Sequence, residues 1–404
     1  MDQTDSAVLI RQSASHCAAI ETARIGLVVP VVGVCHVACL RALAEQLPGL
    51  HVIELADNQR KYPWRPDRDD LGFPRRTVFP GEIVETIPWR RQSAAVTATL
   101  EEIRPEVIVV GSYSEPAMIA TARWAWKRRI PTVLRSVSTY HDKVRRGWRE
   151  MLKSRLVRRY TTVAVTGERA EEYALRLGVR RECVFRTGNM VDNERYASCV
   201  DHVRRSESRE RQRLGLPTRY FLTVSRLAPE KNLLVLLEAF SQYRQCGGRW
   251  DIVLVGSGPQ ETELREMVRA NGIPGVHFVA WKQYDALPPY YALASCLVLA
   301  SVSEPWGLVV NEAMACGLPV LVSERCGCVP ELCREGENGY RFAPESVDEL
   351  AGLMVRMSSN REQLSAFGEA SRRIIASFTP QIWAEKFKTC ILAAMKRRAE
   401  SATL

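Results

Sequence analysis

The chain has 404 residues, of which 46% are hydrophobic, and its formal net charge is +10. A chain of this length is too long for one compact core, so we expect two domains of roughly 150–200 residues each. The sequence contains no run of about eighteen apolar residues that would span a bilayer, and its first residues, which include Asp2 and Asp5, do not resemble a signal peptide. The positive charge favours an anionic partner.

The twelve cysteines mostly lie in apolar contexts, as Cys35 and Cys296 do. This distribution is typical of a reduced, cytoplasmic protein rather than of a disulfide framework. Cys326, Cys328 and Cys333 form a cluster, but they lack the second cysteine pair and the nearby histidines of a zinc site. We therefore predict a cytoplasmic protein that holds no metal at this cluster.

Residues 1–23 are expected to form a flexible extension, and residues 24–205 alternate short apolar runs with helical patterns such as VACLRALAEQL. This alternation predicts a parallel sheet that is covered by helices on both faces, as in doubly wound α/β domains. The DRDD sequence at residues 67–70 follows no predicted strand, so we expect no metal site there. The runs that we predict as strands are GLVVPV, HVIEL, VIVVG, TVLRSV and TTVAVT.

Two loops of this first half are candidate walls of a binding site, because ligands of such sheets bind beyond the carboxyl ends of the strands. The loop at residues 30–36 contains Gly33, which allows a ligand to approach closely, and it ends at His36. The His–Asp pair of the second loop either contacts substrate or only forms a turn, and the sequence leaves both readings open. That loop follows TVLRSV and carries Ser138, Thr139, His141 and Asp142.

Residues 143–159 combine eight basic residues with apolar residues at helical spacing, among them Trp148, Met151 and Leu152. A basic amphipathic helix of this kind can lie on an acidic membrane surface. The alternative is a helix whose apolar side faces the core and whose basic side faces solvent. Nucleic acid is not the expected partner, since no aromatic stacking platform or nucleic-acid motif accompanies the charge.

The segment at residues 201–217, DHVRRSESRERQRLGLP, is polar and charged, and we expect it to connect the two halves. The alternation then restarts, which predicts a second doubly wound domain over residues 206–376. Residues 377–404 follow this sheet, so we expect their helix to cross back and brace the first domain. The second half contains the strand patterns YFLTVS, DIVLVG, VHFVA, CLVLAS and LPVLVS.

The stretch at residues 301–317, SVSEPWGLVVNEAMACG, places Glu304 in a turn after a buried strand and Glu312 about one turn inside the following helix. The unpaired amides of the first helical turn carry partial positive charge, which suits a phosphate. Both glutamates can therefore reach one polar ligand. Alternatively, Glu304 caps the helix and Glu312 is a solvated surface residue.

Two cations follow the strand YFLTVS within one short loop. Arg226 and Lys231 come directly before a predicted helix, and Ser225 opens the loop. Fixed cations at such a place stabilise the negative charge that builds on a diphosphate leaving group. The alternative is a pair of surface charges, each of which contributes little.

The sequence VGSGPQ, with Gly256 and Gly258, partly matches the glycine pattern of dinucleotide-binding sites. However, the third glycine position holds Glu261, and the motif follows the second strand of its half rather than the first. We therefore interpret it as a tight turn that lets the backbone approach a ligand.

Taken together, these residues give the chain a resemblance to the retaining glycosyltransferases of family four, the glycosyl transferases group 1, and within them to a bacterial polysaccharide-type branch. The resemblance rests on EPWGLVVNEAMACGLPV, which is similar to the paired-glutamate signature of the family, and on SRLAPEKN, which is similar to its diphosphate loop. It implies the GT-B fold, in which two doubly wound Rossmann-like domains face each other across a cleft. The first domain would bind the acceptor and the second the nucleotide sugar.

The resemblance also implies roles for individual residues. Arg226 and Lys231 would bind the nucleotide diphosphate, Glu304 would face the donor sugar, and Glu312 would hold the ribose hydroxyls. His141 or Asp142 would lie near the reacting carbon. Further donor contacts would come from Ser225, Gly256, Gly258, Ala280, Trp306, Gly307, Leu308 and Val309, and the acceptor side would include Gly33, His36, Ser138 and Thr139.

The implied reaction is sugar transfer from a nucleotide-diphosphate donor to a saccharide, lipid-linked or small-molecule acceptor, with retention of configuration and no metal or other cofactor. Its expected place is cell-surface polysaccharide or glycoconjugate synthesis, at the inner face of the membrane if residues 143–159 bind lipid. Two alternatives remain. One is a nucleotide-sugar epimerase of the same fold, and the other is a non-catalytic, membrane-associated binding protein.

Overall fold

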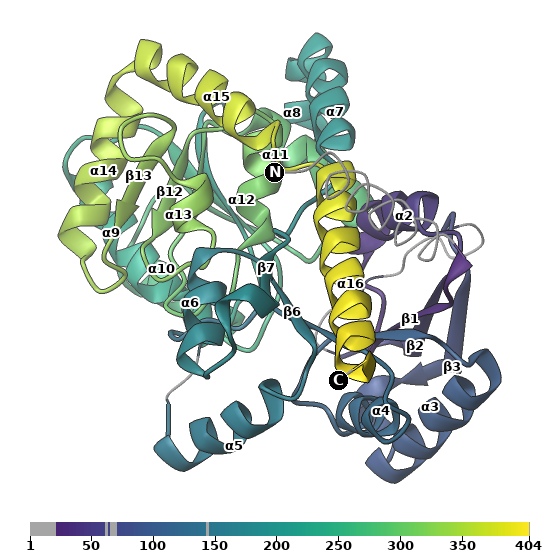
Figure 1. Ribbon diagram of the computed structural model, residues 1–404. Coiled ribbons are helices and arrows are strands. Elements are labelled where there is room, and N and C mark those ends of the chain that lie inside the picture. The colour runs from purple at the N-terminus through teal and green to yellow at the C-terminus, as the bar shows by residue number, and fades with distance from the viewer. Residues whose placement is uncertain (1–21, 61–63, 65–70, 143–144, 404) are drawn as a thin grey trace, which may run out of the picture.

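The computed structural model describes residues 22–60, 64, 71–142 and 145–403. Most of the extension expected at residues 1–23, and the carboxylates at residues 67–70, lie outside these ranges. The described chain forms two α/β units that lie beside each other, with a long C-terminal helix along the first (Figure 1).

The first unit contains a parallel sheet with the strand order β3-β2-β1-β4-β5-β6-β7. Every residue of the central strands β1 and β4 is buried, because helices cover both faces of the sheet. The order reverses between β1 and β4, so the loops after these strands separate and leave a crevice at the carboxyl edge. The strands are β1 (Ile25–Val29), β2 (Leu50–Asn58), β3 (Arg75–Ile83), β4 (Val107–Val110), β5 (Thr132–Ser136), β6 (Thr162–Val165) and β7 (Val184–Arg186). The helices are α2 (Val37–Gln46), α3 (Trp89–Ile103), α4 (Pro116–Lys127), α5 (Gly147–Val157) and α6 (Glu168–Arg176).

The second unit repeats this design with the parallel order β10-β9-β8-β11-β12-β13. Here the order reverses between β8 and β11, which opens a second crevice at a carboxyl edge. The strands are β8 (Tyr220–Val224), β9 (Asp251–Val255), β10 (Val276–Val279), β11 (Cys296–Leu299), β12 (Val320–Ser323) and β13 (Gly339–Phe342). The helices are α9 (Leu233–Gln245), α10 (Glu261–Ala270), α11 (Pro288–Leu293), α12 (Leu308–Ala315), α13 (Val329–Leu332), α14 (Val347–Ser359) and α15 (Arg361–Ile375). The prediction of two doubly wound domains is confirmed.

The segment at residues 201–217 is mostly helical. It contains the end of α7 (Asn193–Arg205) and α8 (Glu207–Leu214). The Asp192 carboxylate caps α7 by accepting a hydrogen bond of 3.1 Å from the backbone N–H of Arg195. Tyr196 and Val200 of α7 are buried in the core of the second unit. Since α7 packs on the second unit, its residues belong structurally to that unit although they precede residue 206.

The C-terminal helix α16 (Pro380–Thr403) crosses back to the first unit, as predicted (Figure 1). Trp383, Phe387 and Ile391 recur every four residues, which places them on one side of the helix. These side chains are buried in a core that includes Ile25 of β1 and Leu43 of α2. Burial of this apolar stripe fixes the last helix of the chain to the first unit.

Candidate functional site

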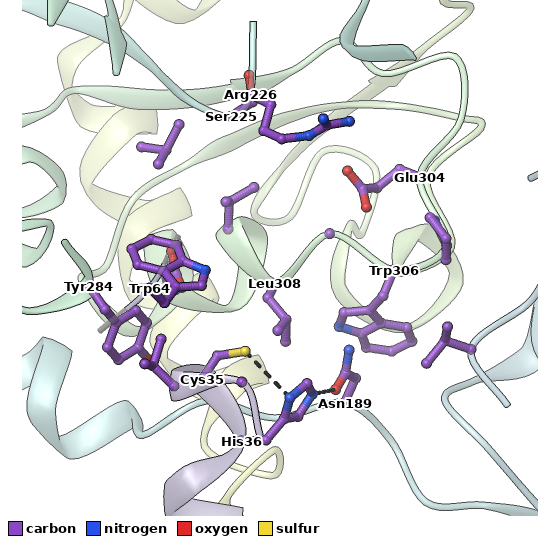
Figure 2. A pocket seen from close by; sticks show the side chains of 18 of the residues that line it. Cys35, His36, Trp64, Asn189, Ser225, Arg226, Tyr284, Glu304, Trp306 and Leu308 are labelled. Carbon is purple, nitrogen blue, oxygen red and sulfur yellow. Dashed lines mark hydrogen bonds between the residues drawn. The ribbon is translucent and has the colours of Figure 1, made fainter. Parts of the chain in front are cut away.

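A cavity of about 510 Å³ lies between the two units, where their crevices meet. The loops after β1 and β4 line it on the side of the first unit, and the loops after β8 and β11 line it on the side of the second. Figure 2 shows Cys35 and His36 from the first unit opposite Arg226, Glu304 and Leu308 from the second. The topology therefore joins two candidate half-sites in one cleft.

Helix α12 forms part of this wall, and its first residue follows Gly307. Gly307 has φ +103°, where a side chain would be strained, and a Cβ there would lie 2.9 Å from Leu299. The N-cap residue of this helix is Gly307, which has no side chain that could cap it, so Glu304 is not the N-cap. Glu312 is only 5% exposed. The alternative in which Glu304 caps the helix and Glu312 is a solvated surface residue is therefore wrong.

The two predicted cations lie in the loop after β8 and line the cavity. Lys231 forms an ion pair with Glu304, and both side chains are more than four-fifths buried. Arg226 forms an ion pair with Glu230. The alternative of two isolated surface charges is thus wrong for Lys231, whose ammonium group joins the loop after β8 to the loop after β11.

Glu312 accepts a hydrogen bond from the hydroxyl of Tyr291, a fully buried residue of α11. Burial raises the pKa of Glu312 to about 7, although the hydrogen bond from Tyr291 opposes this shift. Sequence reasoning did not identify Tyr291, because its pattern LPPYYALA shows only a short apolar helix.

The two glycines of the VGSGPQ turn approach protein backbone. A Cβ on Gly256 would lie 1.8 Å from the Ser225 carbonyl oxygen, and one on Gly258 would lie 2.3 Å from that of Leu227. The turn therefore packs directly against the loop that carries Arg226. Gly256 also lines the cavity, whereas Gly258 and Ala280 do not. Gly258 contacts the Leu227 backbone, and the approach of a ligand to it stays a prediction.

Aromatic side chains surround the end of the cavity beside Gly256. The rings of Trp64 and Trp281 lie 4.3 Å apart, and the ring of Tyr284 lies 6.0 Å from that of Trp64. In the described part of the chain, the Trp281 Nε1 and the nearby Ser225 Oγ are buried without a hydrogen-bond partner. Buried polar atoms are rarely left unpaired, so these two atoms indicate a place for a polar ligand.

The wall of the first unit contains Gly33 and His36, as expected, and also Arg135 of β5 and Asn189. The His36 Nε2 lies 2.8 Å from an Arg135 guanidinium nitrogen and 3.2 Å from the Asn189 Oδ1. Burial and the positive charge of Arg135 lower the pKa of His36 to about 3. The imidazole is therefore neutral at physiological pH.

Glu54 of β2 holds the loop after β1 in place and was not identified from the sequence. Its fully buried carboxylate accepts hydrogen bonds of 3.0 Å from the Val32 N–H, 2.8 Å from Arg75 and 2.7 Å from Thr77. The only sequence signal is an acidic residue inside an apolar strand, HVIEL. A buried carboxylate of this kind is normally found only where hydrogen-bond donors or a positive charge lie next to it.

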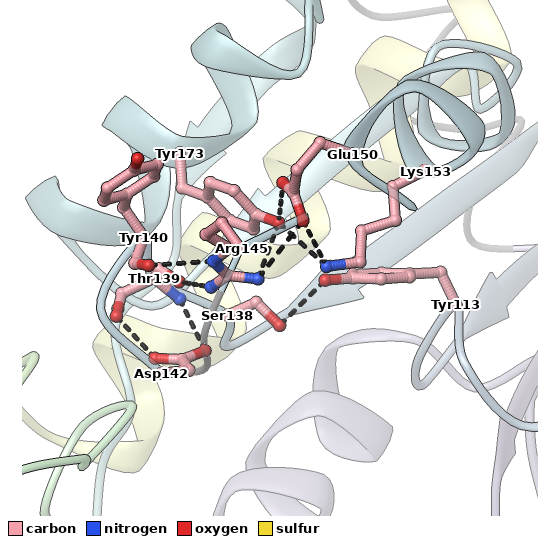
Figure 3. Close-up of polar contacts among 9 residues, drawn as sticks. All are labelled: Tyr113, Ser138, Thr139, Tyr140, Asp142, Arg145, Glu150, Lys153 and Tyr173. Atoms are coloured by element: carbon pink, nitrogen blue, oxygen red, sulfur yellow. Dashed lines mark hydrogen bonds and ion pairs between the residues drawn. The ribbon is translucent and has the colours of Figure 1, made fainter. Parts of the chain in front are cut away.

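The loop at residues 137–142 lies beside the cavity, but Ser138, Thr139, His141 and Asp142 do not line it. The Asp142 carboxylate accepts a hydrogen bond of 2.8 Å from the Thr139 N–H and a second from its hydroxyl, which closes a local turn (Figure 3). The Ser138 Oγ accepts a hydrogen bond from Tyr113. These contacts agree with the reading of the pair as a turn, and a role near the reacting carbon stays a prediction.

His141 lines a second, polar cavity of about 480 Å³, together with Arg169, Arg176 and Arg325. Partial burial and these three arginines lower the pKa of His141. The loop also contacts the second unit, because the Ser303 hydroxyl donates a hydrogen bond of 2.8 Å to the Asp142 carbonyl. The residue before Glu304 is thereby tied to this loop.

Comparison with known proteins identifies both halves of the chain. Residues 12–189 match the family model described as a glycosyl transferase 4-like domain, and residues 204–374 match glycosyl transferases group 1. The sulfoquinovosyl transferase SQD2 of Arabidopsis thaliana is 32% identical over 186 residues, which are 45% of this chain and 34% of that protein. The GDP-mannose-dependent alpha-(1-6)-phosphatidylinositol monomannoside mannosyltransferase of Mycobacterium tuberculosis is 30% identical over 196 residues, 46% and 50% of the two chains. The aligned part thus spans half or less of these relatives.

Solved structures share the whole fold at low identity. Anabaena Alr3699/HepE in complex with UDP and glucose aligns with a TM-score of 0.73 and 19% identity over 91% of this chain and 98% of its own. Sucrose-phosphate synthase from Thermosynechococcus elongatus aligns with a TM-score of 0.69 and 20% identity over 94% and 99%. These similarities show the GT-B fold, and the two family matches together cover most of the chain. The chain therefore belongs to the group 1 glycosyltransferases.

Proposed function

We propose that the protein transfers a sugar from a nucleotide-diphosphate sugar to an acceptor hydroxyl, with retention of the anomeric configuration and without a metal ion. The observation that carries this proposal is the common wall formed by Arg226, Lys231, Glu312 and the amino end of α12 in one cavity. The complex of the structurally similar HepE with UDP and glucose is consistent with a nucleotide-sugar donor.

In this proposal, the diphosphate binds against Arg226, Lys231 and the first-turn amides of α12. These groups stabilise the charge that develops as the bond between sugar and phosphate breaks, which is the role of a metal ion in other transferases. Glu312 accepts hydrogen bonds from the ribose hydroxyls, and Lys231 holds Glu304 towards the sugar. The leaving phosphate takes the proton of the acceptor hydroxyl, and the facing units keep water from the donor.

A thermal-shift screen against UDP, GDP, ADP and their sugars tests the donor. A ligand at a hundred times its dissociation constant adds about 2.7 kcal/mol to the free energy of unfolding, which raises the melting temperature measurably. Absence of a shift with every nucleotide would contradict the proposal.

NMR of the preferred donor, alone and with a panel of saccharide acceptors, then separates the alternatives. An epimerase converts the donor without acceptor, a binding protein leaves it intact, and a retaining transferase yields the donor's anomeric configuration in the product.

We further propose that α5 binds an acidic membrane surface and so brings the enzyme to a lipid-linked or cell-surface saccharide acceptor. Trp148, Met151 and Leu152 are 57%, 50% and 53% exposed, so the alternative of a core-facing apolar side is wrong. Figure 3 shows why this side turns outward: Glu150 and Lys153, on the other side of the helix, bond to each other and to Tyr173 of α6. Within the described ranges, no helix has the length and apolar composition needed to cross a bilayer.

A further inference from the structure

Arg135 places a positive charge on the first-unit wall of the cleft, and no carboxylate in the described part of the chain forms an ion pair with it. It extends from β5, and its accessible part lines the cavity. Among the described residues, its hydrogen-bond partner is the neutral His36 imidazole, at 2.8 Å, and no ion pair involves it. Burial lowers the pKa of its guanidinium, which shows how poorly water reaches this charge.

Among the described residues, the other ionisable groups that act on Arg135 are the thiols of Cys35 and Cys39. Burial raises the pKa of each thiol to about 12, so both are protonated at physiological pH. His36 is neutral as well, because its pKa is lowered to about 3. These three neighbours of Arg135 are therefore uncharged. The Glu312 carboxylate, which lines the same cavity, acts electrostatically on Cys35.

Two other shielded arginines of the first unit are paired with carboxylates. Arg75, 19% exposed, bonds to Glu54 at 2.8 Å, and Arg145, 10% exposed, lies 3.7 Å from Glu150. A shielded cation without a counter-charge is unfavourable, so its retention calls for a reason other than stability. The hydrogen bond to His36 does not supply that reason, because the Asn189 Oδ1 lies 3.2 Å from the same ring nitrogen and can accept a hydrogen bond from it.

We propose that Arg135 binds an oxyanion, a phosphoryl or carboxylate group, carried by the acceptor. This inference rests on the proposed function and names the acceptor class: a negatively charged one. The diphosphate already has Arg226, Lys231 and α12 on the second unit. Arg135 lies on the first unit beside Gly33, where the acceptor is expected. Its planar guanidinium can bind an oxyanion through two parallel hydrogen bonds, which are strong in a site that water reaches poorly.

The test uses the full chain saturated with the nucleotide that binds best in the donor screen, so that the diphosphate contacts are filled. Inorganic phosphate and acetate are then titrated separately and followed by calorimetry. We expect saturable binding of at least one anion by the wild type and at least tenfold weaker binding by Arg135→Met. The control is Arg91→Met, which alters an exposed arginine paired with Glu82 at 2.8 Å; this variant should bind like the wild type. Equal anion affinity in wild type and Arg135→Met would overturn the proposal.

The melting temperature distinguishes binding from a structural role. Because the charge is unbalanced, Arg135→Met should melt no lower than the wild type and should still bind nucleotide. A lower melting temperature with unchanged anion affinity would make Arg135 structural and refute the inference. Arg135→Lys keeps the charge without the planar fork, so it should recover part of the anion affinity.

Two further outcomes would show that the anion bound by Arg135 is not part of the acceptor. If nucleotide saturation abolishes phosphate binding by the wild type, Arg135 belongs to the diphosphate site and the acceptor assignment is wrong. If Arg135→Met weakens the binding of UDP-glucuronate more than the binding of UDP-glucose, the anion belongs to the donor sugar. This result would also refute the acceptor assignment. Failure of the proposed function itself would be recognised separately, since no nucleotide would then bind to the wild type.

Discussion

Donor binding should weaken as the pH falls through about 7, because Glu312 must be ionised to accept hydrogen bonds from the ribose hydroxyls. Its carboxyl group is 5% exposed, and burial raises its pKa to about 7. Between pH 8 and pH 6 the ionised fraction falls about tenfold. We therefore expect the apparent dissociation constant of the donor to rise about tenfold, which corresponds to about 1.4 kcal/mol.

The assay is calorimetric titration with the preferred nucleotide sugar between pH 6 and pH 8. Both phosphates of a nucleotide sugar are diesterified, so the ligand does not titrate in this range, unlike a terminal phosphate with a pKa of about 6. Glu312→Gln should bind weakly at every pH. Tyr291→Phe removes a hydrogen bond that favours the ionised form, so the midpoint should move to higher pH.

Tyr220→Phe is the matched control. Its hydroxyl is also buried, but it donates a hydrogen bond of 2.7 Å to the Tyr290 carbonyl and not to Glu312. This variant should keep the wild-type midpoint even where it lowers the melting temperature. A wild-type affinity that stays constant from pH 6 to pH 8, or a Glu312→Gln variant with the same pH dependence, would refute the reasoning.

Four other results are expected. The pKa of Glu312 rises from 4.5 to about 7 on folding, so the folded state loses stability as the pH rises through this window. Glu312→Gln should therefore raise the free energy of unfolding at pH 8 by about 3 kcal/mol, as measured by urea titration, while the variant binds the donor only weakly. Lys231→Ala should lower transfer by at least about 100-fold and should also lower the melting temperature, because it leaves the buried Glu304 carboxylate without its partner. Arg265→Ala should match the wild type, and a fully active Lys231 variant would contradict the diphosphate role. Activity should persist in EDTA, and complete loss that magnesium restores would contradict the metal-free mechanism. The protein should float with acidic vesicles and Trp148→Ser/Leu152→Ser should not, whereas equal flotation with neutral vesicles, or none with either, would remove the membrane proposal.

The central strands could be predicted because strands buried on both faces have continuous apolar sequences. All five strand patterns of the first half and all five of the second correspond to strands of the structure. The strands β3, β7 and β13 were missed, and each lies at the edge of its sheet. Edge strands are half solvated, and β3 reads RRTVFPGEI, with charged residues and a proline that interior strands exclude. Their pairing follows from the sheet beside them rather than from their own pattern.

The second-unit wall of the cavity could also be predicted, because its residues come from two short continuous motifs. Each motif joins a strand end to a helix, so local chain geometry fixes the order of Arg226, Lys231, Glu304 and Glu312. The first-unit wall of the cavity was predicted less well. His36 and Gly33 line the cavity, but Asp142 closes a turn and His141 faces a second cavity.

The sequence by itself determined the two doubly wound units, the returning C-terminal helix and the paired glutamates, since each depends on periodicity or on residues close in the chain. Only the tertiary structure decided the charge balance of the cleft. Lys231 contacts Glu304, which is 73 positions away in the sequence, and Arg135 contacts His36, which is 99 positions away. Tyr291 bonds to Glu312 from another helix. Burial sets the pKa of Glu312 and shields the charge of Arg135, for which the described residues supply no ion-pair partner. Burial arises only when distant segments exclude water together.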